Sequence, residues 1–432
     1  MRPQELLQHA AALLSPILQF TQTTEQTLAQ YFRQNPKIGA RERALLSDIS
    51  YRVVRLKNLL VSQAEAAPRG IGSQERKLAL LGMKKHMAYF EAGLSEAERE
   101  WLAVAHQVDS QDLPENLPPA QRHNLPDWLA QKLMQELGDH FWPFAFAALQ
   151  PASVDLRVNT AAYKTPKVAA ALTQSGIENS PANFAPDGLR LHERKSIKKH
   201  PLYLQGAFEV QDEGSQLIAL LTQAKREELV VDFCAGAGGK TLAMASMMRG
   251  KGRVYALDAS ATRLEALRPR MERAKLENIY PMAISAGDDE RVQRLLGKAD
   301  CVLVDAPCSG LGTLRRQPDL KWRRQPEELR RFQMLQLAIL RDAARLLKPG
   351  GRLVYATCSV LCEENEEVAQ MFSSAHPDFL PQAVADILQK AQVPDAATLA
   401  TGGDDGRLYL RTWPHWHQVD GFFAAVWRKK AA

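Results

Sequence analysis

The sequence predicts a multidomain protein with an all-α N-terminal domain, a small α+β linker domain and a C-terminal Rossmann-like α/β domain. Three observations predict this organisation. Apolar residues recur at helical spacing through the first part of the chain. Short segments in which apolar and polar residues alternate begin near Pro151, and from Leu229 onward strand-like segments alternate with helix-like segments. We place the three domains at residues 1–140, 146–225 and 226–432.

The composition is that of an ordinary globular protein with a basic balance. The chain has 432 residues, a net charge of +6 and an isoelectric point of about 9.0. This length suffices for several domains, and the charge favours an anionic partner, of which nucleic acid is the leading candidate. The first residues carry no basic segment followed by an unbroken apolar run, and no apolar stretch is long enough to cross a bilayer. We therefore expect a cytoplasmic protein with no membrane partner.

Five cysteines all lie in the second half of the chain, at Cys234, Cys301, Cys308, Cys358 and Cys362. An odd and sparse set argues against a disulfide framework. No Cys-x-x-Cys pair is present, which argues against zinc, so we expect no metal site. For Cys234, Cys301 and Cys362, taken as cysteines alone, we expect small buried apolar side chains.

Two basic stretches precede the α/β domain. In the N-terminal domain, the arginines between Gly39 and Arg55 either contact RNA phosphates or form the solvated face of an amphipathic helix. In the linker domain, a strand at 154–159 and a helix at 166–172 are followed by a basic segment between residues 188 and 200. This segment forms either a solvated loop or an RNA-facing patch, and its basic residues are Arg190, Arg194, Lys195, Lys198 and Lys199.

Strand–helix alternation in the last domain predicts a mainly parallel sheet with helices on both faces. The expected strands lie at 229–233, 253–257, 281–284, 301–304 and 352–355, with two final strands at 408–410 and 422–426. The expected helices lie at 240–248, 261–275, 289–296, 326–347 and 363–372. Pro269 should kink or shorten the second of these helices.

A glycine-rich turn follows the first of these strands, between Phe233 and Lys240. Glycines let the backbone approach a ligand closely, and the following helix start offers unpaired N–H groups to polar ligand atoms. The Gly239-Lys240-Thr241 ending suggests a P-loop, but that motif needs a glycine where this chain has Cys234. We therefore reject nucleoside triphosphate hydrolysis.

Acidic residues follow several strands of the predicted sheet. Asp232, Asp258 and Asp305 end strands, and Asp288 lies just beyond another. Ligands of such sheets bind at the carboxyl ends of the strands, and an acid after the second strand suits the two hydroxyls of a ribose. Capping of the next helix is the alternative for Asp258.

Three motifs together resemble the Sun (RsmB-type) family of RNA cytosine-5 methyltransferases. They are Asp232 to Thr241, Asp305-Ala306-Pro307-Cys308-Ser309-Gly310 and Thr357-Cys358-Ser359. Val210-Gln211-Asp212-Glu213 and Asp420-Gly421-Phe422-Phe423 also look like family features. The family more often has Ala-Pro where this chain has Gly236-Ala237. The helical first part resembles the NusB-like RNA-binding domain of such enzymes.

The resemblance implies a class I methyltransferase domain that uses S-adenosylmethionine. Asp258 would hold the ribose, Asp288 would approach the adenine amino group, and Asp305 would lie near the reacting centre. The cofactor-binding set is Cys234, Ala235, Gly236, Ala237, Gly238, Gly239, Lys240, Asp258, Arg263, Asp288 and Asp305.

The resemblance also implies why two cysteines are needed. Carbon 5 of cytosine is a poor nucleophile, and a thiolate that adds to carbon 6 activates it. In the family the nucleophile is the later cysteine, here Cys358, and Cys308 assists release of the product. Asp305 would bond or protonate ring nitrogen 3, and Lys240 would stabilise the site electrostatically. DNA cytosine-5 enzymes instead use the cysteine of the Pro-Cys motif, so the presence of both cysteines favours RNA.

Residues 311–331 contain seven basic and three acidic side chains around Trp322. They suit either backbone neutralisation and base stacking or a solvated helix start. The substrate that the resemblance favours is small-subunit ribosomal RNA, with transfer RNA as the alternative. We expect the target cytosine to be single-stranded or flipped out of its helix. We also expect the enzyme to be a monomer. A non-catalytic RNA-binding or ribosome assembly factor that retains the fold is the alternative of a different class.

Overall fold

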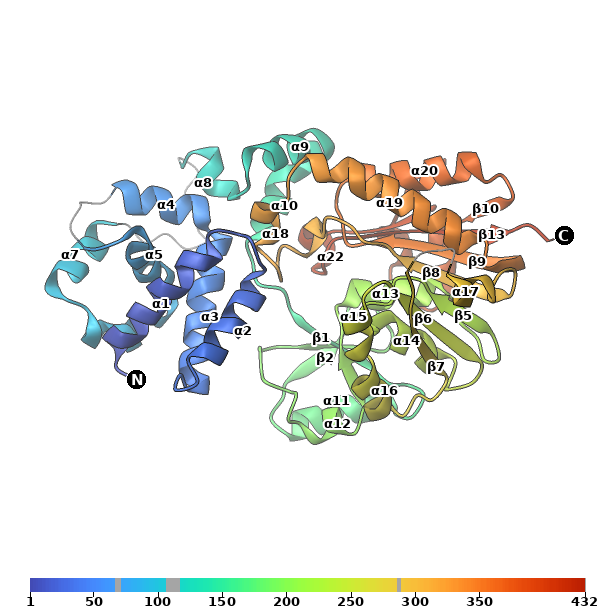
Figure 1. The fold of residues 1–432 in the computed structure, drawn as a ribbon, viewed down its shortest axis with the longest axis horizontal. Coiled ribbons are helices and arrows are strands. Elements are labelled where there is room, and N and C mark those ends of the chain that lie inside the picture. The colour runs from blue at the N-terminus through green and yellow to red at the C-terminus, as the bar shows by residue number, and fades with distance from the viewer. Residues whose placement is uncertain (67–70, 106–116, 286–288, 432) are drawn as a thin grey trace. The chain divides into compact units, whose positions relative to one another are not determined.

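The computed structural model describes residues 1–66, 71–105, 117–285 and 289–431, which divide into two compact units (Figure 1). One unit comprises Met1–Pro151 together with Thr313–Pro326. The other comprises Ala152–Gly312 together with Glu327–Ala432. Among the described residues we find no helix with both the length and the hydrophobicity of a membrane span.

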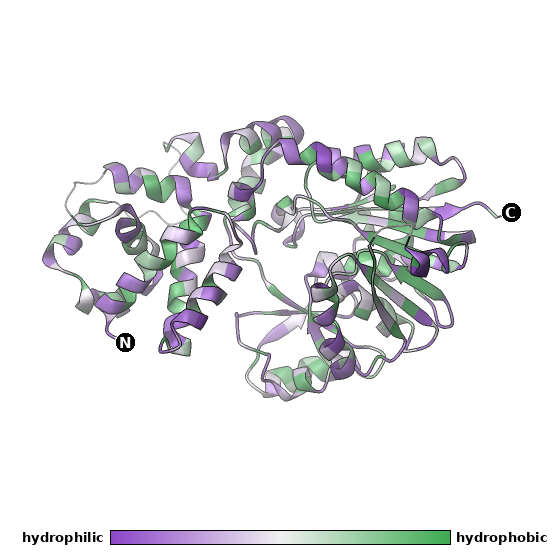
Figure 2. Cartoon of the chain, viewed as in Figure 1, coloured by the Kyte–Doolittle hydropathy of each residue, from purple (hydrophilic) through white to green (hydrophobic). Residues whose placement is uncertain are grey.

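The first unit is helical throughout its described residues, which confirms the expected all-α N-terminal domain. Thr23 and Gln26 form a capping box that starts the second helix, and Ser95 and Glu98 do the same for the seventh. Apolar positions three and four apart face a common core (Figure 2). The helices are α1 (Pro3–Ile17), α2 (Thr24–Gln34), α3 (Ala40–Arg55), α4 (Lys57–Ala66), α5 (Gln74–Gly82), α6 (Met87–Phe90), α7 (Glu96–Val104), α8 (Pro119–His123), α9 (Asp127–Leu137), α10 (Phe141–Ala148) and α18 (Leu320–Arg323).

The basic segment around Trp322 belongs to this helical unit, although the sequence placed it in the last domain. The indole N–H of Trp322 donates to the Val54 carbonyl at 2.9 Å, and the Lys321 ammonium donates to the Arg55 carbonyl at 2.9 Å. Both carbonyls lie at the end of α3, where a helix leaves its last carbonyls without internal partners. Lys321 and Trp322 therefore cap α3.

These contacts correct two RNA-binding interpretations. Lys321 is 2% exposed, and burial, assisted by Arg55 and Lys57, lowers its pKa well below the usual lysine value. Arg55 is 8% exposed and donates to the carbonyls of Gln150 and Arg315. The expectation that Arg55, Lys321 and Trp322 face RNA is wrong, because backbone carbonyls from distant parts of the sequence take up their donors.

The small α+β module forms an antiparallel sheet in the order β2-β3-β1-β4, as expected for the linker region. Leu156, Leu172, Leu189 and Phe208 lie in its core. Its elements are β1 (Val154–Val158), α11 (Thr165–Gln174), β2 (Asn179–Pro181), β3 (Gly188–Leu191), α12 (Pro201–Leu204) and β4 (Phe208–Val210).

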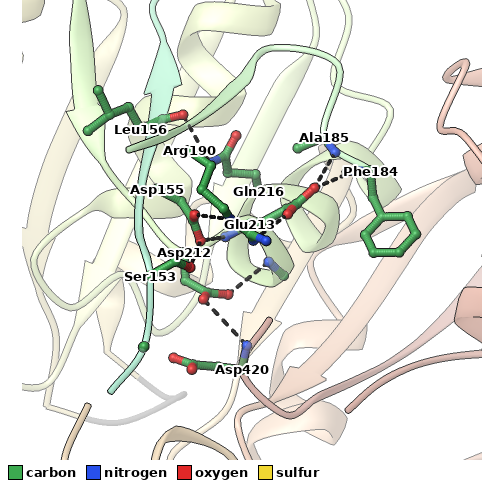
Figure 3. Close-up of polar contacts among 12 residues, drawn as sticks. Ser153, Asp155, Leu156, Phe184, Ala185, Arg190, Asp212, Glu213, Gln216 and Asp420 are labelled. Carbon is green, nitrogen blue, oxygen red and sulfur yellow. Dashed lines mark hydrogen bonds and ion pairs between the residues drawn. The ribbon is translucent and has the colours of Figure 1, made fainter. Parts of the chain in front are cut away.

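An ionic cluster joins this module to α13 (Glu213–Leu221) (Figure 3). Arg190 on β3 donates to Asp155 and to Glu213, both at 2.8 Å. Glu213 also accepts the backbone N–H of Ala185 at 2.9 Å, and its side chain is fully buried. Arg190 is therefore a structural residue, which corrects its place in the proposed RNA-facing patch. Arg194, Lys195, Lys198 and Lys199 are exposed, as either reading of that segment requires.

The large sheet of the described residues has nine strands and is parallel in its first half. Its order is β7-β6-β5-β8-β9-β13-β12-β11, and β10 pairs with β13. The first strand of the α/β region, β5, is central, so the chain leaves it in opposite directions on either side. The strands are β5 (Leu229–Asp232), β6 (Arg253–Asp258), β7 (Ile279–Ala283), β8 (Ala299–Asp305), β9 (Leu347–Thr357), β10 (Phe379–Gln382), β11 (Ala400–Thr401), β12 (Tyr409–Thr412) and β13 (Phe422–Lys429).

Alternate residues of each strand enter different cores. Val230, Cys301 and Val354 pack with α13 and α14, whereas Val231 and Val302 pack with α19 and α20. This period of two follows from the pleat and confirms the Rossmann-like layers, with helices on both faces (Figure 1). The helices are α14 (Gly239–Met247), α15 (Ala261–Glu265), α16 (Arg268–Ala274), α17 (Glu290–Gln293), α19 (Glu327–Ala344), α20 (Glu366–Ala375), α21 (Val384–Lys390) and α22 (Pro414–His417).

Several element boundaries differ from expectation for identifiable reasons. The helix expected at 261–275 is two helices, α15 and α16, and Pro269 lies in the first turn of the second. The sequence missed β10, β11 and α21, which are short elements at the antiparallel end of the sheet. They are too short to give a clear local pattern, and β10 in addition takes its hydrogen bonds from β13, which is distant in sequence.

The capping of α3 predicts a loss of stability on truncation of Trp322. Trp322→Ala should lower the free energy of unfolding by about 3 kcal/mol, because it removes a large side chain from a core and a donor from a helix end. Denaturant unfolding with hydrogen exchange of α3 measures this. Trp322→Phe keeps an aromatic side chain but removes the indole N–H donor, so it should lower the free energy of unfolding by about 1 kcal/mol. Equal stability of all three proteins would contradict the capping role.

Candidate active site

The glycine-rich turn lies at the carboxyl end of β5 and starts α14. Gly236 has a φ of 55° and Gly238 a φ of 78°, both in the left-handed region that glycine tolerates best. A Cβ on Gly238 would stand 2.2 Å from the Leu267 side chain, so this position also lacks space for a larger residue. The turn therefore depends on glycine at residue 238 for both conformation and packing.

Asp258 holds the turn from the neighbouring strand. Its carboxylate accepts the backbone N–H of Gly236 at 2.8 Å and that of Ser260 at 2.7 Å. Ser260 is the N-cap of α15, so Asp258 helps start the next helix as well as fixing the glycine turn. The hydrogen bond to Ser260 supports the helix-start reading of Asp258, and the ribose reading stays a prediction, for which the carboxylate keeps further lone pairs.

Lys240 and Asp305 form an ion pair between the start of α14 and the end of β8. The ammonium nitrogen lies 2.8 Å from Asp305 Oδ2, and Lys240 is 9% exposed. Burial opposes the charge of Lys240, but Asp305 outweighs it, so its pKa lies above the usual lysine value. Lys240 therefore carries its positive charge at neutral pH.

Asp232, at the end of β5, is 1% exposed and feels the charges of this pair. It accepts the Thr241 hydroxyl at 2.6 Å through Oδ2, whereas its buried Oδ1 has no partner among the described residues. Burial raises the pKa of Asp232 to about 7, against the hydrogen bond from Thr241. This carboxyl is therefore poised between two protonation states near neutral pH.

The two cysteines of the later motifs lie side by side. Cys308 follows β8 and Cys358 follows β9, and these strands are parallel neighbours with Asp305 opposite Ala356. The two sulfur atoms are 3.4 Å apart, and neither of these two cysteines forms a disulfide. The hydrogen bond to Cys358 and burial raise the pKa of Cys308, so Cys308 keeps its proton.

Two glycines bring the backbone close behind these sulfurs. The N–H of Gly312 donates to the Cys358 carbonyl, and the N–H of Gly421 donates to the Gly312 carbonyl, both at 2.8 Å. A Cβ on Gly312 would stand 1.9 Å from the Gly421 carbonyl oxygen. The motif around Gly421 therefore supports the Cys358 loop, and its Phe422 ring lies 5.7 Å from the Lys240 nitrogen.

The structure brings together most of the predicted site residues. Lys240 contacts Asp305, Cys308 contacts Cys358, and Asp258 holds the 234–239 turn. Arg263 is an exposed residue of α15, and Asp288 lies outside the described residues. Sequence reasoning missed Glu364, whose buried carboxylate accepts hydrogen bonds beside both cysteines. Glu364 lies in a run of acidic residues whose pattern is typical of an ordinary helix start.

Comparisons with known proteins identify the family of this chain. The family described as 16S rRNA methyltransferase RsmB/F matches residues 219–428, and the RsmF/B-like ferredoxin-like domain matches 125–198. The chain is 33% identical to the probable ribosomal RNA small subunit methyltransferase B of Bacillus subtilis, over 71% of this chain and 66% of that protein. Its namesake in Synechocystis is 33% identical, over 73% of this chain and 69% of that protein. The chain belongs to the RsmB/F family of methyltransferases.

Membership of this family confirms the resemblance drawn from the three motifs and supports S-adenosylmethionine as the cofactor. Among solved structures, a methyltransferase homologue from Pyrococcus horikoshii superposes with a TM-score of 0.62 at 27% identity. That match covers 72% of this chain and 100% of the other. The NusB likeness of the helical unit stays a prediction.

Asp232 predicts a pH-dependent stability with a defined sign. Its folded-state pKa of about 7 exceeds its ordinary value of 3.8, so the folded protein keeps a proton that the unfolded chain releases. The stability from this proton is complete below about pH 4 and is lost as the pH rises through about 7. Asp232→Asn should flatten this decline in denaturant unfolding between these limits.

A suitable control for this experiment is Asp378→Asn, which changes an exposed carboxyl in the same compact unit. It should leave the pH profile as in the wild type. If Asp232→Asn and the wild type show parallel profiles, Asp232 does not titrate in this range.

Proposed function

We propose that this protein transfers the methyl group of S-adenosylmethionine to carbon 5 of a cytosine in RNA, through a covalent intermediate between Cys358 and the base. The observation that carries the proposal is the pair of free thiols at 3.4 Å, Cys308 and Cys358, at one edge of the sheet. The Lys240–Asp305 ion pair ends on the same edge. Two thiols beside a charged pair suit covalent activation of a pyrimidine ring.

The residues of the glycine turn fit S-adenosylmethionine. Among the described residues, no atom lies within 4 Å of a Cβ built on Gly236, so this side of the turn is open to a ligand. Asp258 beside the turn would accept the ribose hydroxyls. The remaining predicted contacts, Cys234 to Lys240, Arg263, Asp288 and Asp305, belong to this proposal. The cofactor would supply an electrophilic methyl group.

The chain's own residues divide the chemistry between them. Cys308 keeps its proton, which leaves Cys358 to form the sulfur–carbon bond at carbon 6. Electron density that moves into the ring is stabilised by a proton that Asp305, as a carboxylic acid, gives to nitrogen 3, and the Lys240 ammonium at 2.8 Å then stabilises the carboxylate that remains. Carbon 5 would then take the methyl group from the cofactor, whose sulfur would keep the electrons of the broken methyl–sulfur bond.

Release of the product requires loss of the proton at carbon 5 and departure of the Cys358 sulfur. Cys308, whose sulfur lies 3.4 Å from that of Cys358, is the base for this step. Its thiol gives its proton to water once Cys358 has bonded to carbon 6, and its thiolate then accepts the carbon 5 proton while the electrons of that bond re-form the double bond between carbons 5 and 6. We assign Cys308 to this release step, in which the Cys358 sulfur leaves carbon 6 with its bonding electrons. The aromatic ring and the free thiolate are then restored.

Small-subunit ribosomal RNA is the substrate we favour, because it stands in the names of the curated relatives. The charge of +6 agrees with an RNA partner. We further propose that the protein acts as a monomer in the cytoplasm. Transfer RNA is the alternative substrate, and a non-catalytic assembly factor is the alternative that the intact thiol pair opposes.

The deciding experiment measures transfer of labelled methyl from S-adenosylmethionine to unmodified small-subunit ribosomal RNA, transfer RNA and DNA in parallel. We expect label only in ribosomal RNA, as 5-methylcytosine. Cys358→Ala should abolish the transfer, at least about 10⁴-fold, because it removes the sulfur that we assign to the bond at carbon 6. Label in transfer RNA or DNA would make that nucleic acid the substrate instead. Undiminished transfer by Cys358→Ala would exclude Cys358 as the nucleophile.

Cys308→Ala should behave differently from Cys358→Ala. The variant can form the bond to carbon 6 but releases the product slowly, so a protein–RNA adduct should survive denaturation and appear as a shifted band in gel electrophoresis. The double variant Cys308→Ala with Cys358→Ala provides the control and should show no adduct. A Cys308→Ala protein that turns over without adduct would remove Cys308 from the release step.

A further inference from the structure

The Glu364 carboxylate lies between the two cysteine loops and accepts hydrogen bonds from both. Its Oε1 accepts the backbone N–H of Ser309 at 2.7 Å. Its Oε2 accepts the hydroxyls of Ser309 and Ser359, each at 2.5 Å. Ser309 directly follows Cys308, and Ser359 directly follows Cys358. One carboxylate therefore fixes the residue after each thiol.

The burial of this carboxylate marks it as more than a surface acid. Glu364 is fully buried, and a buried charge is strongly unfavourable unless hydrogen bonds compensate it. Here four donors do so, the fourth being the Gln336 amide at 3.2 Å from Oε1. The same Gln336 amide donates to the Pro307 carbonyl at 2.9 Å, which extends the network to the start of the Cys308 loop.

The backbone around Glu364 is itself held to β9. The Tyr355 hydroxyl donates to the Glu364 carbonyl at 2.6 Å. The neighbouring Asn365 accepts the Thr357 hydroxyl at 2.5 Å and donates to the Ser359 carbonyl at 3.1 Å. The turn after Cys358 thus folds back onto its own strand, and Glu364 reaches from it to the other loop.

We propose that Glu364 is a positioning residue that holds Cys308 and Cys358 at the separation which the reaction needs. The two serine hydroxyls are 3.1 Å apart, so the network closes between the residues that directly follow the two cysteines. The catalytic consequence rests on the proposed function, but the geometric consequence does not. Without the carboxylate, each cysteine loop would still continue from its own strand, but the hydrogen bonds that connect the two loops would be lost.

Glu364 also influences the chemistry of the sulfurs through its charge. After the bond to Cys358 and burial, its negative charge is a further cause that raises the pKa of Cys308. Glu364→Gln keeps the shape of the side chain but changes both its hydrogen bonds and its charge, so it tests positioning and charge together. Ser359→Ala removes one hydrogen bond without a change of charge, so it tests positioning alone. Both kinds of variant are needed.

The first test measures the thiol separation without any RNA. Diamide converts two adjacent thiols to a disulfide while its nitrogen–nitrogen double bond takes up the two hydrogens, and intact mass follows the reaction. Glu364→Gln should slow formation of the Cys308–Cys358 disulfide about 10-fold. Ser359→Ala, which removes one donor and no charge, should slow it less. An unchanged rate in both variants would overturn the proposal, whether or not the protein methylates RNA.

The second test follows methyl transfer to the RNA that the wild type accepts. Glu364→Gln should lower kcat about 100-fold and leave KM for RNA and the affinity for S-adenosylmethionine within about twofold, because displaced reacting groups affect the chemical step. A merely structural defect would instead change binding and the melting temperature together. Loss of S-adenosylmethionine binding in Glu364→Gln would contradict a positioning role.

A matched control is Glu367→Gln, which changes an exposed glutamate that accepts the Gln333 amide at 2.9 Å. It should match the wild type in disulfide formation and in kcat. If Glu364→Gln does not fold, the disulfide rate of Ser359→Ala decides the proposal. If the wild type methylates no RNA, the proposed function fails while the disulfide rates still decide the role of Glu364.

Discussion

The parallel register of β8 and β9 is the constraint on which the site depends. Because Asp305 pairs with Ala356, the two strands end at the same edge of the sheet, and similar numbers of residues then lead to Cys308 and Cys358. The distance of 3.4 Å between the sulfurs follows from this pairing and from the short loops that continue it. A shift of register by two residues would separate the thiols by about 7 Å along the strands.

Close backbone contacts at glycine residues preserve the arrangement of the two cysteine loops, because a larger side chain at these positions would clash. Gly312 lies between the Cys358 carbonyl and the Gly421 backbone, in a space that cannot hold a Cβ. Gly214 plays a similar part further away, since a Cβ there would stand 2.5 Å from the Phe422 ring. Gly214, which directly follows the Val210–Glu213 motif, and Gly421 thus act on the site through packing, because each position has room only for a small residue.

The sequence predicted the helical first part and the layers of the α/β domain, because these follow from local periodicity. Its motifs also singled out Lys240, Asp305 and the two cysteines, which the structure places in two contacting pairs. It failed where a side chain meets a partner far away in the chain. Lys321 and Trp322 read as a nucleic-acid surface, yet Lys321 lies 266 residues from its carbonyl partner, Arg55. Glu364 was missed for the same reason, since an acidic run after Cys358 gives no local sign of a buried acceptor.

The excursion of residues 313–326 into the helical unit makes the two units inseparable as pieces of chain. The polypeptide passes between the units at 151–152, at 312–313 and again at 326–327. A shortened protein beginning at Ala152 would expose the indole of Trp322 and leave the ammonium of Lys321 without its carbonyl. Exchange of the helical unit between relatives must therefore carry this later segment along, so the natural module for such an exchange is discontinuous in sequence.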